Sequence, residues 1–403
     1  MPILILGRMV DTLNLLSKKT TAQRLWIQKN LFSSWYNTIL TIISLSFLFW
    51  ISESFIQWAI KDAKWAVIEA NFRFFFVGYY PVRPNNLLWR PWLALGIIMS
   101  MGGLSWGIAS QTKIFTRKNL AIFGVIAIIF SLIAIPSNIY SSKILLTFLL
   151  LIVVNAIIGK KIGNKFPNLI SWLSLFWIGI FFIDLWILLG TREVKLDDLS
   201  GLILNILVAV VSISLCFPLG VLFALGRQSE LPVIRWLSIL YIEIIRALPL
   251  IGILFMAQIM LPLVLPANIR LDRVVRVIAG FTIFSSAYLA ENVRGGLQAV
   301  PKGQTEAAKA LGLNSVYVLA FIVLPQAIRA VIPSIVGQFI SLFKDTSLLA
   351  IIGLFDLLGI VQKIVSNPKF LGDYQENYVF IALIFWLICY SMSLASRRLE
   401  NKM

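Results

Sequence analysis

The 403-residue sequence contains no histidine and only two cysteines, Cys216 and Cys389. Histidine and cysteine supply most zinc sites and many catalytic nucleophile pairs, so their scarcity excludes most of those sites. Both cysteines lie inside apolar runs, which indicates small core side chains rather than a disulfide framework. We therefore expect no catalytic residue and no metal site in this chain.

Charged residues are also scarce. They make up 13% of the chain, where soluble domains average about 25%, and 59% of the residues are hydrophobic. This composition predicts a membrane protein. The formal net charge of +17 does not indicate a nucleic-acid partner, because the cations lie mainly at the ends of apolar runs and not on one polar face.

A bilayer core requires about 20 mostly apolar residues per helix. The sequence therefore predicts an all-α polytopic membrane protein with about ten transmembrane helices. The predicted spans are residues 37–55, 88–109, 119–136, 143–159, 170–190, 201–226, 236–262, 274–292, 326–350 and 378–396.

The distribution of Lys and Arg between the spans places both termini in the cytoplasm. A polar stretch at 190–200 predicts two modules, an N-terminal extension, 1–190, and a second module, 191–403. Segment 56–87 mixes aromatics with cations, which favours an interfacial helix, with a periplasmic docking element as the alternative. Asp184 lies near the outer end of the fifth span, and we expect it to be capped or to reach the interface, with a functional role as the alternative.

The longest polar segment between apolar runs is 291–325. In it, Glu306-Ala307-Ala308 is followed after three residues by Gly312, and nine residues later by Ile322-Val323-Leu324-Pro325. Alanine favours helix and lets a partner backbone approach closely. Gly312 suits the left-handed end of a short helix. This predicts a short docking helix, and an ordinary amphipathic loop helix is the alternative.

This spacing resembles the EAA loop of ABC-importer membrane subunits. Glu291-x-x-Arg294-Gly295-Gly296-Leu297, Gly303-Gln304-x-Glu306 and Lys344-Asp345-Thr346-Ser347-Leu348 are similar to the polar amino-acid branch of that family. The resemblance runs from about residue 199 to the C-terminus. It implies a type I permease core of five spans in the bacterial plasma membrane. The additional N-terminal spans resemble those of the larger subunit of general L-amino-acid importers.

The resemblance also implies the partners. No G-x-x-x-x-G-K-[ST] motif occurs, so ATP and Mg would be bound by a separate ATPase dimer and not by this chain. An extracytoplasmic amino-acid-binding protein, the membrane lipid and a second permease subunit complete the expected assembly, and the asymmetric extension favours a heterodimer. The ATPase would dock on the residues of the short helix and its ends, Gly303, Glu306, Ala307, Ala308, Leu311 and Gly312.

Charged residues inside the predicted spans are candidates for a gate or a substrate path. Glu243 and Arg246 are three apart, which predicts a pair on one helix face, and Pro249 predicts a break in that helix. Arg246-Ala-Leu-Pro249 also resembles the family's R-x-x-P-L segment, which implies gating.

Glu291 and Arg294 repeat the three-residue spacing. There we favour positioning of the loop over contact with substrate, and we expect Gly295-Gly296 to let the chain leave the helix. Lys344, Asp345, Thr346 and Ser347 offer charges and hydroxyls for an amino acid, or pin the outer end of the ninth span.

These features predict the permease of an ATP-driven importer of polar or general L-amino acids. A secondary transporter driven by ion gradients would require inverted repeats and polar residues at mid-membrane in both halves, and the first half lacks such residues. A non-transporting membrane scaffold would not require the EAA spacing.

Overall fold

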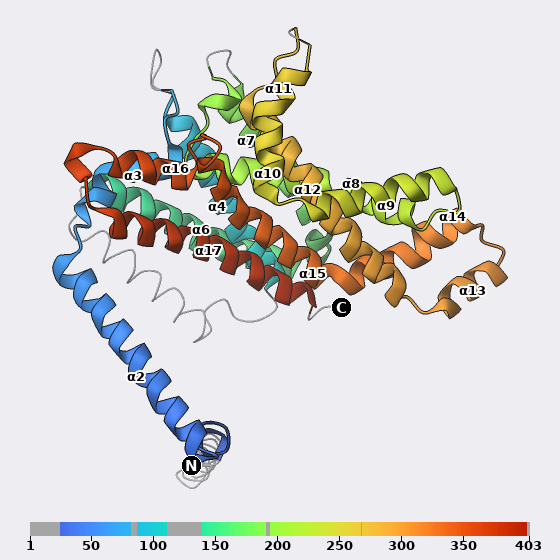
Figure 1. The fold of residues 1–403 in the computed structure, drawn as a ribbon, viewed down its shortest axis with the longest axis horizontal. Helices are drawn as coiled ribbons and strands as arrows, with labels where there is room; N and C mark the ends of the chain where they lie inside the picture. Colours follow the sequence, from blue (N-terminus) through green and yellow to red (C-terminus); the bar gives the residue numbers. More distant parts are fainter. Residues whose placement is uncertain (1–24, 82–86, 111–138, 191–193, 267, 401–403) are drawn as a thin grey trace. The chain divides into compact units, whose positions relative to one another are not determined.

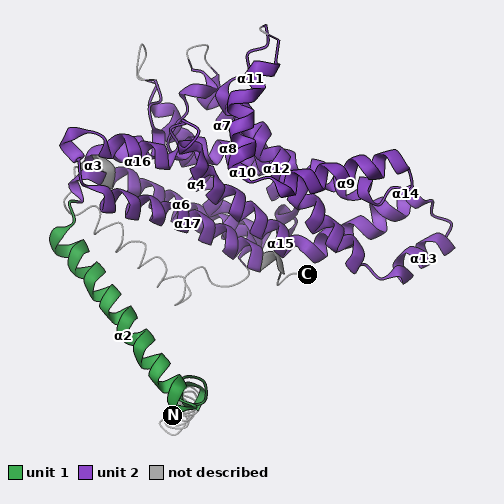
Figure 2. Ribbon diagram, in the orientation of Figure 1, with its two compact units in different colours: residues 1–64 green, residues 65–403 purple. Residues whose placement is uncertain are grey.

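The computed structural model describes residues 25–81, 87–110, 139–190, 194–266 and 268–400, and Figure 1 draws the ribbon. Every regular element within those ranges is helical. The chain forms two compact units, Met1–Lys64 and Trp65–Met403, which Figure 2 colours separately. The all-α prediction is confirmed.

The main described element of the first unit is helix α2, Trp35–Gln57, which continues into a π-helical turn, Trp58–Asp62. The hydroxyl of Ser34 caps its start by accepting a hydrogen bond from the backbone N–H of Asn37 at 3.4 Å. Apolar side chains lie on all sides of α2, and none of them is buried within the protein. A helix that is apolar all round is typical of a membrane span.

The second unit begins with the remaining described helices of the extension. They are α3 (Ala66–Val77), α4 (Trp89–Ala109), α6 (Ile139–Lys165) and α7 (Leu173–Leu189).

Helices α4 and α6 pack side by side (Figure 1). A Cβ atom on Gly103 would lie 2.4 Å from the carbonyl oxygen of Ile152, and one on Gly159 would lie 2.4 Å from that of Leu104. Gly107 and Gly163, four residues further along each helix, are similarly close to the partner backbone. Small residues at this spacing let membrane helices approach closely.

Helix α3 packs against α8 (Leu202–Arg227), α16 (Leu357–Val365) and α17 (Tyr374–Glu400). Its apolar side chains, among them Ile68 and Phe75, are fully buried in the main core. One face of α3 therefore packs against helices of its own chain, and the interfacial position of segment 56–87 stays a prediction.

Leu188 and Ser200, which flank the predicted boundary, both form hydrogen bonds with the segment that follows α3. The backbone N–H of Tyr79 donates to Ser200 Oγ at 2.7 Å, and the Tyr80 hydroxyl donates to the carbonyl of Leu188 at 2.6 Å. Residues 65–190 thus belong to the same compact unit as the second module, and the division at residue 190 stays a prediction about function.

The second module continues with further helices that follow α8. They are α9 (Pro232–Ala247), α10 (Leu250–Phe255), α11 (Leu261–Val264), α12 (Arg273–Ala299), α13 (Lys302–Ala310), α14 (Ser315–Tyr317) and α15 (Leu324–Asp345). A π-helical stretch, Val318–Val323, joins α14 to α15, and a 3₁₀ turn, Thr346–Ala350, follows α15. Helices α16 and α17 complete the chain.

Eight described helices are long and apolar enough to cross a membrane, and α9 with α10–α11 makes a ninth span if the bent pair counts as one. These nine correspond to nine of the ten predicted spans. The remaining prediction, 119–136, lies outside the described residues.

A small second core fixes the geometry of the helices that carry the candidate site. It joins α8, α9, α12 and α15, and three of its fully buried members are alanines, Ala224, Ala290 and Ala327. Because alanine has little side chain, these helices lie close together, and polar groups from different helices come within contact distance.

Asp184 differs from the expectation. Its side chain on α7 is only 7% exposed, and its Oδ1 atom accepts no hydrogen bond from the part of the chain that the structure describes. The expected cap is therefore not formed at Oδ1 by any described residue.

Candidate functional site

The predicted docking helix is α13, Lys302–Ala310, and it projects from the rest of the second unit in Figure 1. Pro301 precedes it in extended conformation, and Gly312 follows it with φ of +81°, as the sequence predicts. The N–H of Leu311 donates to the carbonyl of Ala307 at 3.2 Å and closes the last turn.

Most of α13 is exposed. Gly303, Glu306 and Ala307 face solvent, whereas Ala308 is 5% exposed, and α13 packs on the π-helical stretch before α15. Leu311, which follows α13, and Phe321, on the π-helical stretch that α13 packs on, are 83% and 70% exposed. Exposed apolar side chains of this kind mark a surface that another protein or the membrane covers.

A short chain connection and one hydrogen bond join α13 to the spans. It follows α12 after only Val300 and Pro301, and Gln326 on α15 donates through Nε2 to Oε1 of Gln304 at 3.4 Å. Helix α13 is therefore joined to both α12 and α15.

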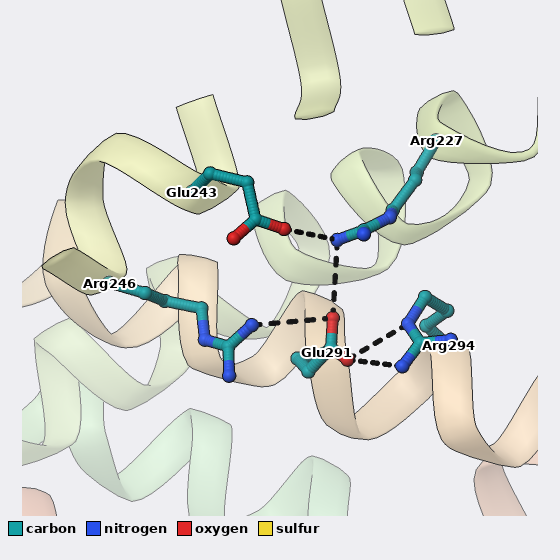
Figure 3. Close-up of polar contacts among 5 residues, drawn as sticks. All are labelled: Arg227, Glu243, Arg246, Glu291 and Arg294. Carbon is teal, nitrogen blue, oxygen red and sulfur yellow. Dashed lines mark hydrogen bonds and ion pairs between the residues drawn. The ribbon is translucent and has the colours of Figure 1, made fainter. Parts of the chain in front are cut away.

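An ion-pair cluster lies where α8, α9 and α12 meet (Figure 3). Arg227 Nη1 lies 3.1 Å from Glu243 Oε1 and 3.3 Å from Glu291 Oε2, and Arg246 Nη1 lies 3.6 Å from Glu291 Oε2. Arg294 completes the group with two hydrogen bonds to Glu291 Oε1. Glu291 thus holds three arginines from three helices.

The cluster confirms one predicted pair and corrects another. Glu291 and Arg294 pair as predicted. Glu243 and Arg246 do not pair with each other among the interactions that the described chain forms. Glu243 turns to Arg227 on α8, and Arg246 turns to Glu291 on α12. Both neighbouring helices offer partners across the interface, and no spacing along the chain indicates that Arg227 belongs to the site.

The expected exit of the chain at Gly295-Gly296 is also wrong, because α12 continues to Ala299. Gly296 has a different role. A Cβ atom there would lie 2.4 Å from the carbonyl oxygen of Ala327 on α15, whereas one on Gly295 would meet nothing within 4 Å. Gly296 therefore lets the backbones of α12 and α15 touch, two residues after Arg294 of the ion-pair cluster.

Pro249 breaks the seventh predicted span. Helix α9 ends at Ala247, Leu248 and Pro249 are extended, and α10 leaves at 103° to α9. The missing N–H of Pro249 and its ring account for the break, which the sequence predicts correctly.

The Lys344-Asp345-Thr346-Ser347 segment divides into an exposed and a buried part. Lys344 is exposed at the end of α15, and Asp345 and Ser347 are half-buried. Thr346 is fully buried. Its hydroxyl donates to the carbonyl of Phe343 at 2.6 Å and accepts from Asn205 Nδ2 at 2.9 Å.

Asn205 and Asp356 extend this buried contact, and sequence reasoning missed both. Asn205 Nδ2 also donates to Asp356 Oδ2 at 3.2 Å, and Asn205 Oδ1 accepts from the N–H of Leu357 at 3.0 Å. Asp356 Oδ1 caps α16 by accepting from the N–H of Gly359 at 2.9 Å. Burial raises the pKa of the Asp356 carboxyl to about 6, against the opposing effect of these hydrogen bonds.

A neutral polar contact joins α12 and α15 and was also missed. Asn292 Nδ2 donates to Gln338 Oε1 at 2.6 Å, Ser334 Oγ donates to Asn292 Oδ1 at 2.8 Å, and Gln338 Nε2 donates to the Ser285 carbonyl at 2.7 Å. Side-chain amides inside membrane helices are expensive unless they are paired or line a polar cavity.

No group of three or more His, Cys, Asp or Glu residues in the described ranges has the geometry to hold a metal ion. The charged groups of the ion-pair cluster are paired with one another and join three helices.

Comparison with known proteins supplies independent findings. Residues 216–403 match the family described as "Binding-protein-dependent transport system inner membrane component". The Inner membrane amino-acid ABC transporter permease protein YhdY of Escherichia coli is 35% identical over 96% of this chain and 94% of its own length. The glutamate/glutamine/aspartate/asparagine transport system permease protein BztC of Rhodobacter capsulatus is 33% identical over 94% and 93%.

A solved structure described as an amino acid ABC transporter with histidines is 28% identical over 50% of this chain and 92% of its own, with a TM-score of 0.46.

Proposed function

The chain belongs to the amino-acid ABC transporter permeases, the inner-membrane components of binding-protein-dependent transport systems, and we propose that it passes polar or general L-amino acids across the membrane while a partner ATPase moves it through α13. The family makes it a transport subunit and not an enzyme. ATP and Mg are bound by the ATPase. The name of the Rhodobacter relative, with its acidic and amide amino acids, supports the substrate class.

The observation that carries the coupling proposal is the exposure of α13. Helix α13 is short and polar, and Glu306 and Ala307 are exposed on it. It is followed by the exposed Leu311 and by the turn at Gly312, and Phe321 further along the chain is also exposed. Such a surface fits a groove on another protein. Its contacts with α12 and α15 carry a movement of the ATPase dimer to the spans. Docking of the ATPase on α13 would require α13, and with it both termini, to lie on the cytoplasmic side.

The ion-pair cluster is the proposed gate. Glu243, Arg246, Glu291 and Arg294, joined by Arg227, tie α8, α9 and α12 together beside the break at Pro249. Opening would separate these helices, and the paired charges would hold the closed state. Ligand and ATP shift such an equilibrium only as far as they bind the two states differently.

The other end of α15 carries the proposed substrate contacts. Lys344, Asp345 and Ser347 retain exposed or half-exposed groups for the carboxylate and ammonium of an amino acid. Thr346, which is buried on Asn205, holds the segment in place. A second permease subunit, different from this one, and an extracytoplasmic amino-acid-binding protein complete the assembly.

Reconstituted vesicles test the proposal. The wild-type complex, with its ATPase and binding protein, should take up a polar amino acid only when ATP is present on the ATPase side. Ala307→Trp and Glu306→Lys should abolish both ATPase co-purification and uptake. Ser366→Trp, which enlarges an exposed small residue at the end of α16, is the matched control. Normal co-purification with Ala307→Trp would refute the assigned docking surface.

A further inference from the structure

A groove of about 700 Å³ lies between α4, α6 and α7, outside the elements that carry the coupling site. Its walls are almost entirely apolar and include Leu93, Ile97, Leu104, Leu151 and Ile180. The volume falls within the roughly 300–1,000 Å³ of ordinary ligand sites. An apolar groove on membrane helices suits a hydrocarbon chain.

A tryptophan and a lysine lie at one end of the groove. Gly103 packs on Ile152 and Gly107 on Ala156, so α4 and α6 run parallel, and Trp92 and Lys143 lie at the same end of the pair. Both residues line the groove. Lys143 is exposed and forms no ion pair with any described residue.

Trp92 stands beside Lys143 in the wall of the groove. Its ring packs against Phe72 and Phe148, at centroid distances of 6.3 and 6.1 Å, which fixes its orientation. Its Nε1 atom is buried, so the residue offers the groove its ring and not this donor. A tryptophan ring beside a lysine is typical of the level of the lipid headgroups in a membrane protein.

We propose that this groove binds one phospholipid of the surrounding membrane, with an acyl chain along the apolar wall and the phosphate beside Lys143. The lysine ammonium donates to a phosphate oxygen and offsets its charge. The competing occupant is residues 111–138 of this chain. That stretch contains no acidic residue and brings no anion to Lys143, so charge complementarity favours the lipid.

Two matched pairs of variants test the proposal in the complete, purified transport complex. Gly96 lines the groove, and a Cβ atom added to it would lie 3.8 Å from the nearest atom, in the side chain of Leu151. Gly96→Leu therefore fills the groove without a backbone clash. Gly102→Leu is its control, since Gly102 lies on the same helix in open space. Lys143→Gln removes the cation, and Lys161→Gln, an exposed lysine at the other end of α6, is its control.

The measurement is the number of phospholipids that each complex retains after detergent exchange, counted by native mass spectrometry. Gly96→Leu and Lys143→Gln should each retain one phospholipid fewer than the wild type, and both controls should match the wild type. Equal retention by all five proteins would overturn the proposal. So would a cryo-EM map in which polypeptide of residues 111–138, and not a separate lipid, fills the groove.

Discussion

Glu291 and Arg227 are 64 positions apart in the sequence, yet Oε2 of Glu291 lies 3.3 Å from Nη1 of Arg227. Arg246 and Arg294 contact the same carboxylate, so Glu291 is shared by three arginines, one of which, Arg227, also pairs with Glu243 (Figure 3). The contact joins α8, α9 and α12, and it determines which substitutions in the cluster matter.

Glu291→Gln should cost more stability and more transport than Glu243→Gln. Losing Glu291 removes the carboxylate that all three guanidinium groups share and leaves only Glu243 beside Arg227, and hydrogen bonds to charged groups contribute about 1.5–3 kcal/mol each. Glu243 contacts Arg227 alone, and its side chain is 54% exposed, so its loss should cost about 1 kcal/mol or less. Thermal unfolding of the purified complex and uptake by vesicles give the ranking, and equal effects would contradict it.

The two adjacent glycines of α12 should respond in opposite ways. Gly296→Ala places a Cβ 2.4 Å from the carbonyl oxygen of Ala327, so α12 and α15 must separate and stability should fall. Gly295→Ala meets open space and should be neutral or stabilising, because alanine favours a helix by about 1 kcal/mol over glycine. Unfolding temperatures of the two variants test this. A stable Gly296→Ala protein would show that the helices do not touch there.

Asp356 predicts a pH dependence. Its folded pKa of about 6 lies above the usual value, so the folded state binds this proton more tightly than the unfolded chain does. The resulting stabilisation is fully present below the unfolded pKa and is lost as the pH rises through about 6.

Asp356→Asn removes the titration. The wild type should therefore gain stability relative to this variant between pH 7.5 and pH 5, measured by thermal unfolding at both pH values. A difference that stays constant or moves the other way would contradict the assignment.

The sequence predicted the features that depend on local chemistry. Helix α13, its end at Gly312 and the break at Pro249 follow from residues within a few positions of each other. The Gly103/Gly107 and Gly159/Gly163 spacings were also readable as close packing of α4 and α6, although no prediction was made from them. Glycines four apart on an apolar helix are the signal for such packing.

What the sequence did not predict depends on which helices become neighbours. Arg227 and Asp356 enter their clusters through partners on other helices, and no spacing along the chain indicates those partners. The Glu243–Arg246 pair failed for the same reason, because each residue finds a partner on another helix. The burial of α3 was missed because aromatic residues suit a protein interior as well as a membrane interface.

Site-directed cross-linking at Ala307 tests the central claim most directly. In a chain with Cys216 and Cys389 replaced by serine, Ala307→Cys provides a single thiol on the exposed face of α13. Treatment of membranes that contain the whole complex with a short bifunctional thiol–amine reagent should join this chain to the ATPase subunit. Absence of that product from an assembled, transporting complex, with A307C labelled instead by a membrane-impermeant reagent from the extracytoplasmic side, would contradict the account.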